Sequence, residues 1–148
     1  MNELITALRL ALGNTFFMYY KTHAYHWNVE GIEFSQYHDF FGDLYDEVYG
    51  AVDPTAENLR KLGAYAPISI MELYNYKTIT EDSVMPVLLN EMLTNLITAN
   101  NEVYNSFSKV FDLATDAKEQ GLANFAADRM DAHRKHGWML TASLKKIG

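Results

Sequence analysis

The chain has 148 residues, a net charge of −7 and no cysteine. This length suits a single domain, and the missing thiols exclude disulfides and thiolate metal sites. The negative charge excludes a phosphate-binding surface spread over the whole molecule, although a local one is still open. The sequence shows neither a basic leader with an unbroken apolar run nor an apolar stretch of about 20 residues. We therefore expect an intracellular, cytoplasmic protein without a membrane segment.

Two long helices are predicted in the first half of the chain. Apolar and aromatic residues recur at spacings of three and four over residues 2–29, which is typical of a helix, and Gly31 is a natural stop. The same pattern continues over residues 35–62 and ends at Gly63. Pro54 lies inside the second segment, where it removes a backbone donor and crowds the preceding turn. We therefore expect a kink or a break there.

The second half predicts two more long helices. A connection comes first, with one short helix expected at residues 68–74. The third long helix is expected at residues 83–113, with Pro86 in its first turn, and the fourth at residues 117–146. Two short turns and one longer middle connection join the four long helices, and the longer connection suits the crossover of ferritin-like bundles. The sequence thus predicts one all-α domain over residues 1–148, a ferritin-like four-helix bundle with a short extra helix in the middle connection.

Several kinds of catalytic site lack their patterns in this sequence. It contains no glycine-rich phosphate loop, no His-Glu-x-x-His motif and no plausible Ser-His-Asp arrangement. The usual di-iron bundle takes a Glu-x-x-His pair from each of two helices. Here no glutamate is followed three residues later by a histidine. A metal site in this bundle would therefore differ from the ordinary one inside the bundle.

Four residues are candidates for such a site: His26, His38, Asp53 and Glu57. Imidazole and carboxylate donors suit iron, manganese or zinc. Asp53 and Glu57 share a helix face because they are four residues apart, while His26 and His38 flank a turn. His38 and Asp53 are separated by roughly 22 Å along one helix, so a single chain could hardly bring both pairs to one ion. Two copies packed head to tail across a two-fold axis could, and the spacing predicts a site at a dimer interface.

The stretches "HAYHWNVEGIEFSQYH", "DLYDE" and "DPTAENLRKLGAYA" resemble the signature of the Dps-type mini-ferritins, the DNA-protection-during-starvation proteins. Near the C-terminus, "DAHRKHGWMLTASL" is similar to the final helix of that family. The resemblance implies a hollow homo-dodecamer. It also implies oxidation of Fe(II), preferably by hydrogen peroxide, with the ferric mineral stored in the cavity as protection against oxidative damage.

The resemblance also assigns roles to the candidate residues. His26 and His38 match the histidine ligands of one subunit, and Asp53 and Glu57 match the carboxylate ligands of the other. Trp27 matches a tryptophan beside the site.

One ligand of the family is missing from this chain. An aspartate usually follows the second histidine by four residues, and this position is Gly42 here. Two interpretations are open. Asp43 or Asp46, if the helix is distorted, or a water fills the gap, or one of two iron positions is weakened. His23 is a further candidate for a role beside the site, and zinc or manganese could occupy the same ligands.

Acidic pores are a further implication of the resemblance. Asp112, Asp116 and Glu119 are the candidates near the start of the last helix, with stabilisation of that helix's N-terminus as the alternative. The lysine-rich N-terminal tail that binds DNA in some Dps proteins is not matched, because Arg9 is the only basic residue before Lys21. We therefore expect weak or absent DNA binding.

Three functions remain in competition. The first is a mini-ferritin ferroxidase. The second is a non-catalytic cage whose ferroxidase site is degraded at Gly42. The third is a helical-bundle interaction module that forms no cage. His133 and His136, which share a helix face, are expected to pack or to contact solvent rather than to bind metal.

Overall fold

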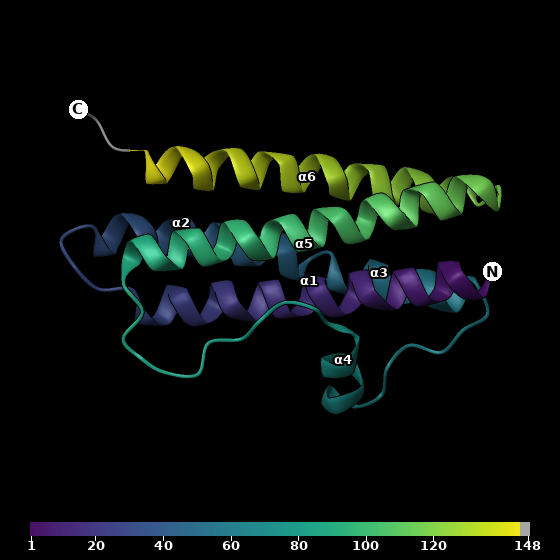
Figure 1. The fold of residues 1–148 in the computed structure, drawn as a ribbon, viewed down its shortest axis with the longest axis horizontal. Coiled ribbons are helices and arrows are strands. Elements are labelled where there is room, and N and C mark those ends of the chain that lie inside the picture. The colour runs from purple at the N-terminus through teal and green to yellow at the C-terminus, as the bar shows by residue number, and fades with distance from the viewer. Residues whose placement is uncertain (146–148) are drawn as a thin grey trace.

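The computed structural model describes residues 1–145. These residues form six helices and no strand (Figure 1). The helices are α1 (Asn2–Asn28), α2 (Phe34–Tyr49), α3 (Val52–Lys61), α4 (Ile70–Tyr76), α5 (Leu89–Asp116) and α6 (Gln120–Leu144). The predicted four-helix bundle is confirmed, with α2 and α3 together making its second long member and α4 the short extra helix.

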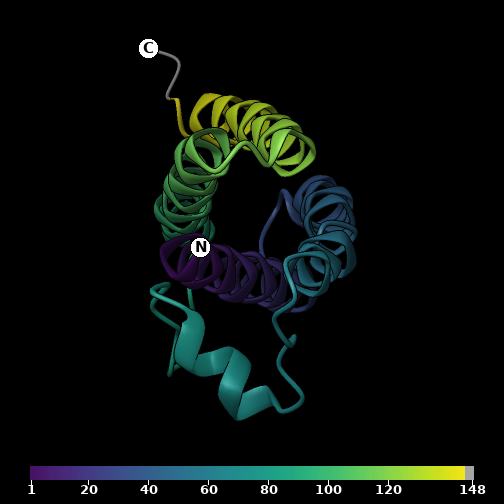
Figure 2. The same ribbon diagram turned by 90° about the vertical axis from the view of Figure 1, so that its right-hand side faces the viewer.

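The middle connection sets the direction of the helices. Helices α1 and α6 run one way along the bundle, while α2, α3 and α5 run the other way (Figure 1). Because α3 and α5 are parallel, the chain between them must travel back along the length of the bundle. Residues 62–88 do so on the outer side of α1, where they also carry α4 (Figure 2). This is the crossover connection of a ferritin-like bundle.

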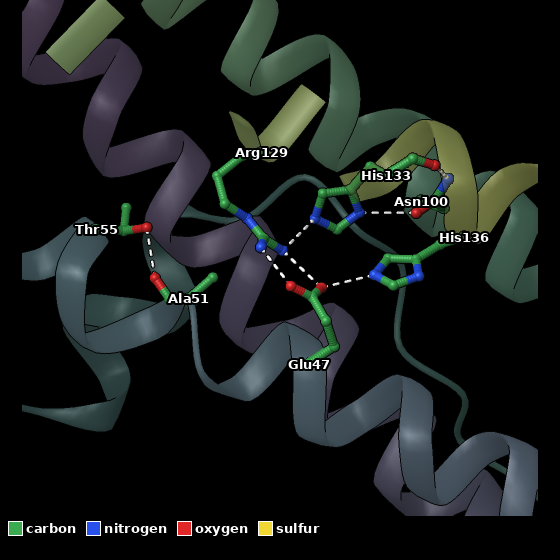
Figure 3. Close-up of polar contacts among 7 residues, drawn as sticks. All are labelled: Glu47, Ala51, Thr55, Asn100, Arg129, His133 and His136. Atoms are coloured by element: carbon green, nitrogen blue, oxygen red, sulfur yellow. Dashed lines mark hydrogen bonds and ion pairs between the residues drawn. The ribbon is translucent and has the colours of Figure 1, made fainter. Parts of the chain in front are cut away.

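The break expected near Pro54 is confirmed. Helix α2 ends at Tyr49 and α3 begins at Val52, so that Pro54 stands in the first turn of α3, where its missing N–H is no loss. The hydroxyl of Thr55 donates to the carbonyl of Ala51 at 2.6 Å, which secures this turn (Figure 3). The break changes the direction of the second half of the long helix, which carries the candidate carboxylates Asp53 and Glu57.

Two stops predicted at glycines are also confirmed. Gly31, in the turn between α1 and α2, has φ +120°, and Gly63, just past α3, has φ +85°. The N–H groups of Gly63 and Ala64 donate to the carbonyls of Arg60 and Leu59, both at 3.0 Å. This pair of bonds is the Schellman arrangement, which satisfies the last carbonyls of a helix.

Three predicted boundaries were wrong. Helix α5 begins at Leu89 instead of 83, because Pro86 disfavours a helical conformation of the residue before it and cannot donate to a ladder. It also ends later than 113, at Asp116. Lys118 has φ +59° and makes the turn to α6, which therefore begins after it, at Gln120 rather than 117. The predicted last residue of that helix, Lys146, lies outside the described residues.

The short helix in the connection begins two residues later than predicted. The hydroxyl oxygen of Ser69 accepts from the backbone N–H of Glu72 at 3.1 Å and so caps α4. At its other end α4 lies against α1, where a Cβ on Gly13 would stand 2.7 Å from the Cβ of Tyr76. A glycine at position 13 thus permits this close approach.

Apolar side chains from five of the helices fill the interior. The largest that are almost fully buried come from α1, α2, α3, α5 and α6, together with Ile79 from the connection. They are Leu4, Leu8, Leu12, Met18, Phe41, Leu59, Met92, Leu96, Phe107 and Leu140. Within residues 1–145 no helix is both long enough and apolar enough to cross a membrane.

Candidate metal centre

His26 and His38 lie face to face beside the turn that joins α1 to α2. Their ring centroids are 3.8 Å apart and the ring planes differ by 18°. The Nδ1 of His26 lies 2.6 Å from the carbonyl oxygen of His38, and the Nδ1 of His38 lies 2.7 Å from the carbonyl oxygen of His26. Because a carbonyl oxygen can only accept, both Nδ1 atoms donate, so that in the neutral form of each ring Nε2 keeps a lone pair. This is the tautomer of a metal-binding histidine, with the ring fixed by a backbone partner.

Gly42 lies directly against this pair. A Cβ at position 42 would stand 3.2 Å from Cε1 and 3.3 Å from Nδ1 of the His26 ring. The ring itself is held by its hydrogen bond to the carbonyl of His38 and by the stacking. The missing side chain therefore makes room for His26 at the position where the family usually has an aspartate. Asp43 is exposed and hydrogen bonds to neither histidine among the described residues.

Aromatic rings surround the pair on the α1 side. The His23 ring stacks on Tyr45 with 3.9 Å between centroids, and its centroid is 4.1 Å from that of Trp27. The hydroxyl of Tyr19 and Nδ1 of His23 share a hydrogen bond of 2.9 Å. Burial, and next the neighbouring charge of His26, lower the pKa of His23. His23 and Trp27 thus lie beside the histidine pair, and their roles there stay predictions.

The two carboxylates stand apart from the histidines within one chain. Asp53 and Glu57 are exposed side chains one turn apart on α3. Within residues 1–145 no three His, Asp or Glu side chains lie close enough to hold one metal ion. The two predicted pairs of ligands are thus separate within one chain, and nothing in a single chain tests whether a second copy completes each pair. That completion stays a prediction.

The acidic pore candidates lie near the α5–α6 turn. Asp112 and Asp116 belong to the last turns of α5 and Asp116 is its last residue. Glu119 stands at the start of α6, but its side chain makes no capping hydrogen bond. Both aspartates are exposed and Glu119 is half-buried. Their role in a pore stays a prediction.

His133 and His136 pack inside the bundle, and the prediction of packing is confirmed. They are 1% and 8% exposed and belong to a polar cluster with Glu47, Asn100 and Arg129 (Figure 3). The sequence interpretation missed this cluster. The spacing of Arg129, His133 and His136 puts all three on one face of α6, which was a signal, but nothing in the sequence showed that Glu47 of α2 is their partner.

The sequence and the fold of this chain can be compared with those of known proteins. A family model for the ferritin-like domain matches residues 5–148. Antigen TpF1 of Treponema pallidum is 32% identical over 128 residues, covering 86% of this chain and 72% of that protein. General stress protein 20U of Bacillus subtilis is 30% identical over 149 residues, covering 96% of this chain and 97% of that protein. The chain therefore belongs to the ferritin-like family.

Solved structures narrow the class. The crystal structure of antigen TpF1 matches with a TM-score of 0.91 at 30% identity, covering 97% of this chain and 92% of that one. The Dps protein of Vibrio cholerae, described as a ferritin-like diiron-carboxylate protein, matches with a TM-score of 0.91 at 26% identity, covering 97% and 90%. Within the family, the fold and the relatives of this chain are those of the Dps-type mini-ferritins.

Proposed function

We propose that the protein oxidises Fe(II), preferably with hydrogen peroxide, at sites shared between two copies, and stores the ferric product in a hollow dodecamer. The ferritin-like family and the Dps relatives favour iron storage. The observation that carries the proposal is the reciprocal pair of His26 and His38. Each ring uses Nδ1 for a backbone carbonyl, which leaves the Nε2 of each neutral ring free to bind an ion.

Asp53 and Glu57 of a second copy complete the proposed site. Both are exposed and one turn apart on α3, so they can present two carboxylates to a neighbouring molecule. Imidazole and carboxylate donors bind Fe(II), and zinc or manganese would compete for them. The carbonyls that hold His26 and His38 fix both rings before iron arrives, and the carboxylates offset the positive charge that grows when Fe(II) becomes Fe(III).

The proposed reaction balances without release of hydroxyl radicals. Hydrogen peroxide accepts one electron from each of two Fe(II) ions, its O–O bond breaks, and uptake of two protons gives two waters. The products are two Fe(III) ions, which hydrolyse to mineral in the cavity. Trp27, which is 55% exposed beside His23, stands near enough to meet a stray oxidant.

Gly42 favours one alternative, a cage without catalysis. This glycine supplies no donor, and a Cβ in its place would press on the His26 ring. The site would then hold one iron weakly instead of a reactive pair. Crystals soaked in Fe(II) distinguish the two functions: two metal peaks a few ångströms apart support the ferroxidase, whereas one peak or none supports the passive cage.

The ferroxidase is tested with purified protein, Fe(II) and peroxide. Ferric absorbance should rise faster with the native protein than in buffer. It should slow to the buffer rate in His38→Ala and in Asp53→Ala, while Glu81→Ala, which removes an exposed carboxylate from the connection, should keep the native rate. A native protein no faster than buffer contradicts the proposal.

A mixing experiment tests whether two copies share the site. One variant lacks both histidines (His26→Ala, His38→Ala) and the other lacks both carboxylates (Asp53→Ala, Glu57→Ala). Each alone should be inactive. When the two are co-expressed in equal amounts, about a quarter of the sites should combine intact histidines with intact carboxylates, so activity returns to about a quarter of native. Mixed assemblies as inactive as the separate variants would show that the ligands are not shared in this way.

The assembly and DNA binding have tests of their own. Light scattering should give the mass of a dodecamer, and a monomer or dimer would instead support a helical interaction module. The net charge of −7 per chain opposes binding to phosphates. A gel-shift assay at physiological salt should therefore show no retarded DNA.

A further inference from the structure

Glu47 on α2 forms hydrogen bonds with two side chains of α6. It lies about 13 Å further along α2 than His38. Arg129 donates from Nη1 to Oε2 of Glu47 at 2.6 Å and from Nη2 to Oε1 at 3.0 Å. His136 donates from Nε2 to Oε1 at 2.6 Å. Figure 3 shows both α6 side chains converging on the carboxylate from one face of that helix. Arg129 and His136 are each 8% exposed, so the guanidinium charge is buried.

His133 is oriented as a ligand toward the same guanidinium. The Nδ2 of Asn100 donates to the carbonyl of His133 at 2.8 Å, which turns Oδ1 toward Nδ1 of the His133 ring, 2.7 Å away. Because Oδ1 can only accept, the hydrogen is on Nδ1 and Nε2 keeps its lone pair. That lone pair accepts from Nη2 of Arg129 at 3.1 Å (Figure 3). Gly137 leaves room for the amide, since a Cβ there would stand 3.1 Å from Nδ2 of Asn100.

A buried neutral imidazole with Nδ1 held by a carbonyl oxygen and Nε2 aimed at a cation is the arrangement of a metal-bound histidine. Burial, and next the positive charge of Arg129, keep the pKa of His133 well below its usual range, so the ring is neutral. Arg129 does not satisfy all its donors in this place. Its buried Nε has no hydrogen-bond partner among residues 1–145, whereas buried polar atoms are normally paired.

We infer that the Arg129 guanidinium occupies a cation site made by Glu47, His133 and His136, and that it keeps divalent metal out of the bundle interior. With Arg129 in place these three side chains do not lie close enough to hold one metal ion. Brought together in the space that the guanidinium fills, two imidazoles and one carboxylate would make a three-ligand set with an open position, which suits Zn(II), Co(II) or Fe(II). The guanidinium supplies the positive charge that the carboxylate needs. Arg129 thereby leaves metal binding to other parts of the molecule. This inference does not depend on the proposed ferroxidase.

The distances around the guanidinium show how far the donors are from the bond lengths of a metal site. Nη2 of Arg129 lies 3.0 Å from the Glu47 oxygen and 3.1 Å from Nε2 of His133. Bonds from a metal to these donors are about 2.0–2.2 Å, so an ion must lie about 1 Å closer to each of them than Nη2 does. His136 donates from Nε2 to Glu47, so it must also lose that hydrogen before Nε2 can bind an ion. The side chain of Glu47 is 41% exposed and can make most of that movement. His133 stays where Asn100 holds it.

The test replaces Arg129 in a background of His26→Ala and His38→Ala, which removes the histidines of the other candidate site. Co(II) is the probe because its visible absorption reports imidazole ligands and geometry. Arg129→Ala should bind about one Co(II) per chain more than the background does, with a visible band of four- or five-coordinate Co(II). Arg129→Lys, the matched control, keeps the positive charge and should gain none.

Each remaining outcome decides the inference. Equal Co(II) binding by Arg129→Ala and the background overturns it, as does extra Co(II) that persists after the further change His133→Ala. If Arg129→Ala is poorly folded, metal binding must restore its structure, because binding free energy is then folding free energy. Added Co(II) should recover the helical circular dichroism of this variant and not of Arg129→Ala/His133→Ala. Failure to recover it also overturns the inference.

Discussion

Replacing Glu47 by alanine should destabilise the bundle because the buried guanidinium of Arg129 loses its carboxylate partner. The carboxylate accepts three short hydrogen bonds from Arg129 and His136, which are each 8% exposed. Breaking a buried ion pair costs about 3–5 kcal/mol, but the side chain of Glu47 is 41% exposed, so water can partly replace it. We expect a loss of about 2–3 kcal/mol. For a chain of this size that lowers Tm by about 5–10 °C.

Thermal unfolding followed by circular dichroism measures this loss. Asp128→Ala is the control, because it removes an exposed carboxylate from α6 that makes no hydrogen bond within residues 1–145. Its Tm should change by no more than about 2 °C. Glu47→Gln keeps the size and one acceptor and should fall between the two. If the Tm of Glu47→Ala equals that of Asp128→Ala, the reasoning that this carboxylate compensates the buried guanidinium is refuted.

The same carboxylate predicts a pH dependence. Burial acts to raise the pKa of Glu47, but the hydrogen bonds from His136 and Arg129 outweigh it and hold the pKa well below its usual value of 4.5. The unfolded chain therefore binds this proton first, and the stability from Glu47 is present above about pH 4.5 and lost as the pH falls below it. His133, whose pKa is lowered, adds a loss that begins as the pH falls through 6.5. The acid loss below pH 4.5 should shrink in Glu47→Gln, and an unchanged profile contradicts this assignment.

Three further substitutions test close backbone geometry. Gly13→Ala should lower Tm by several degrees, because its Cβ would stand 2.7 Å from the Cβ of Tyr76 and overpacking of about 1–3 kcal/mol exceeds the gain in helix propensity of about 1 kcal/mol. An unchanged Tm would show that α4 is loosely seated. Gly42→Ala should slow iron oxidation while Tm changes by less than about 3 °C, because it displaces the His26 ring without removing a ligand; a native rate contradicts this. Lys118→Gly should raise Tm by about 2–3 °C, since Lys118 has φ +59° and glycine adopts this conformation freely. A lower Tm would mean that the lysine side chain itself stabilises the turn.

The helices were predictable because their signals are local. Apolar spacing along α1 and α2 placed both correctly, and glycines at positions 31 and 63 marked turns that require positive φ. Pro54 predicted the break before α3, because a proline lacks the backbone N–H and crowds the turn that precedes it. The boundaries around α5 were less accurate. Pro86 is compatible both with a first helical turn and with an extended segment ahead of the helix, and the prediction chose the first where the structure has the second.

The candidate site was predictable only in part. The residue types and spacing of His26 and His38 in the sequence were enough to nominate them as metal ligands. The reciprocal bonds to each other's backbone carbonyl, which select the tautomer, depend on how the α1–α2 turn folds back. The absence of a side chain at Gly42 is explained only by the structure, which places the His26 ring against this position. The sequence shows that the side chain is missing but not which group lies there.

The sequence by itself determined the class of fold, the helical segments and the chemical types of the donors, because periodicity, turn residues and ligand chemistry are properties of neighbours in the chain. The tertiary structure decided which distant groups meet. Glu47 and Arg129 are 82 residues apart in sequence, yet their charges face one another across the bundle. Such a pairing depends on the register between α2 and α6, which is set by the packing of the whole core and is encoded in no single segment.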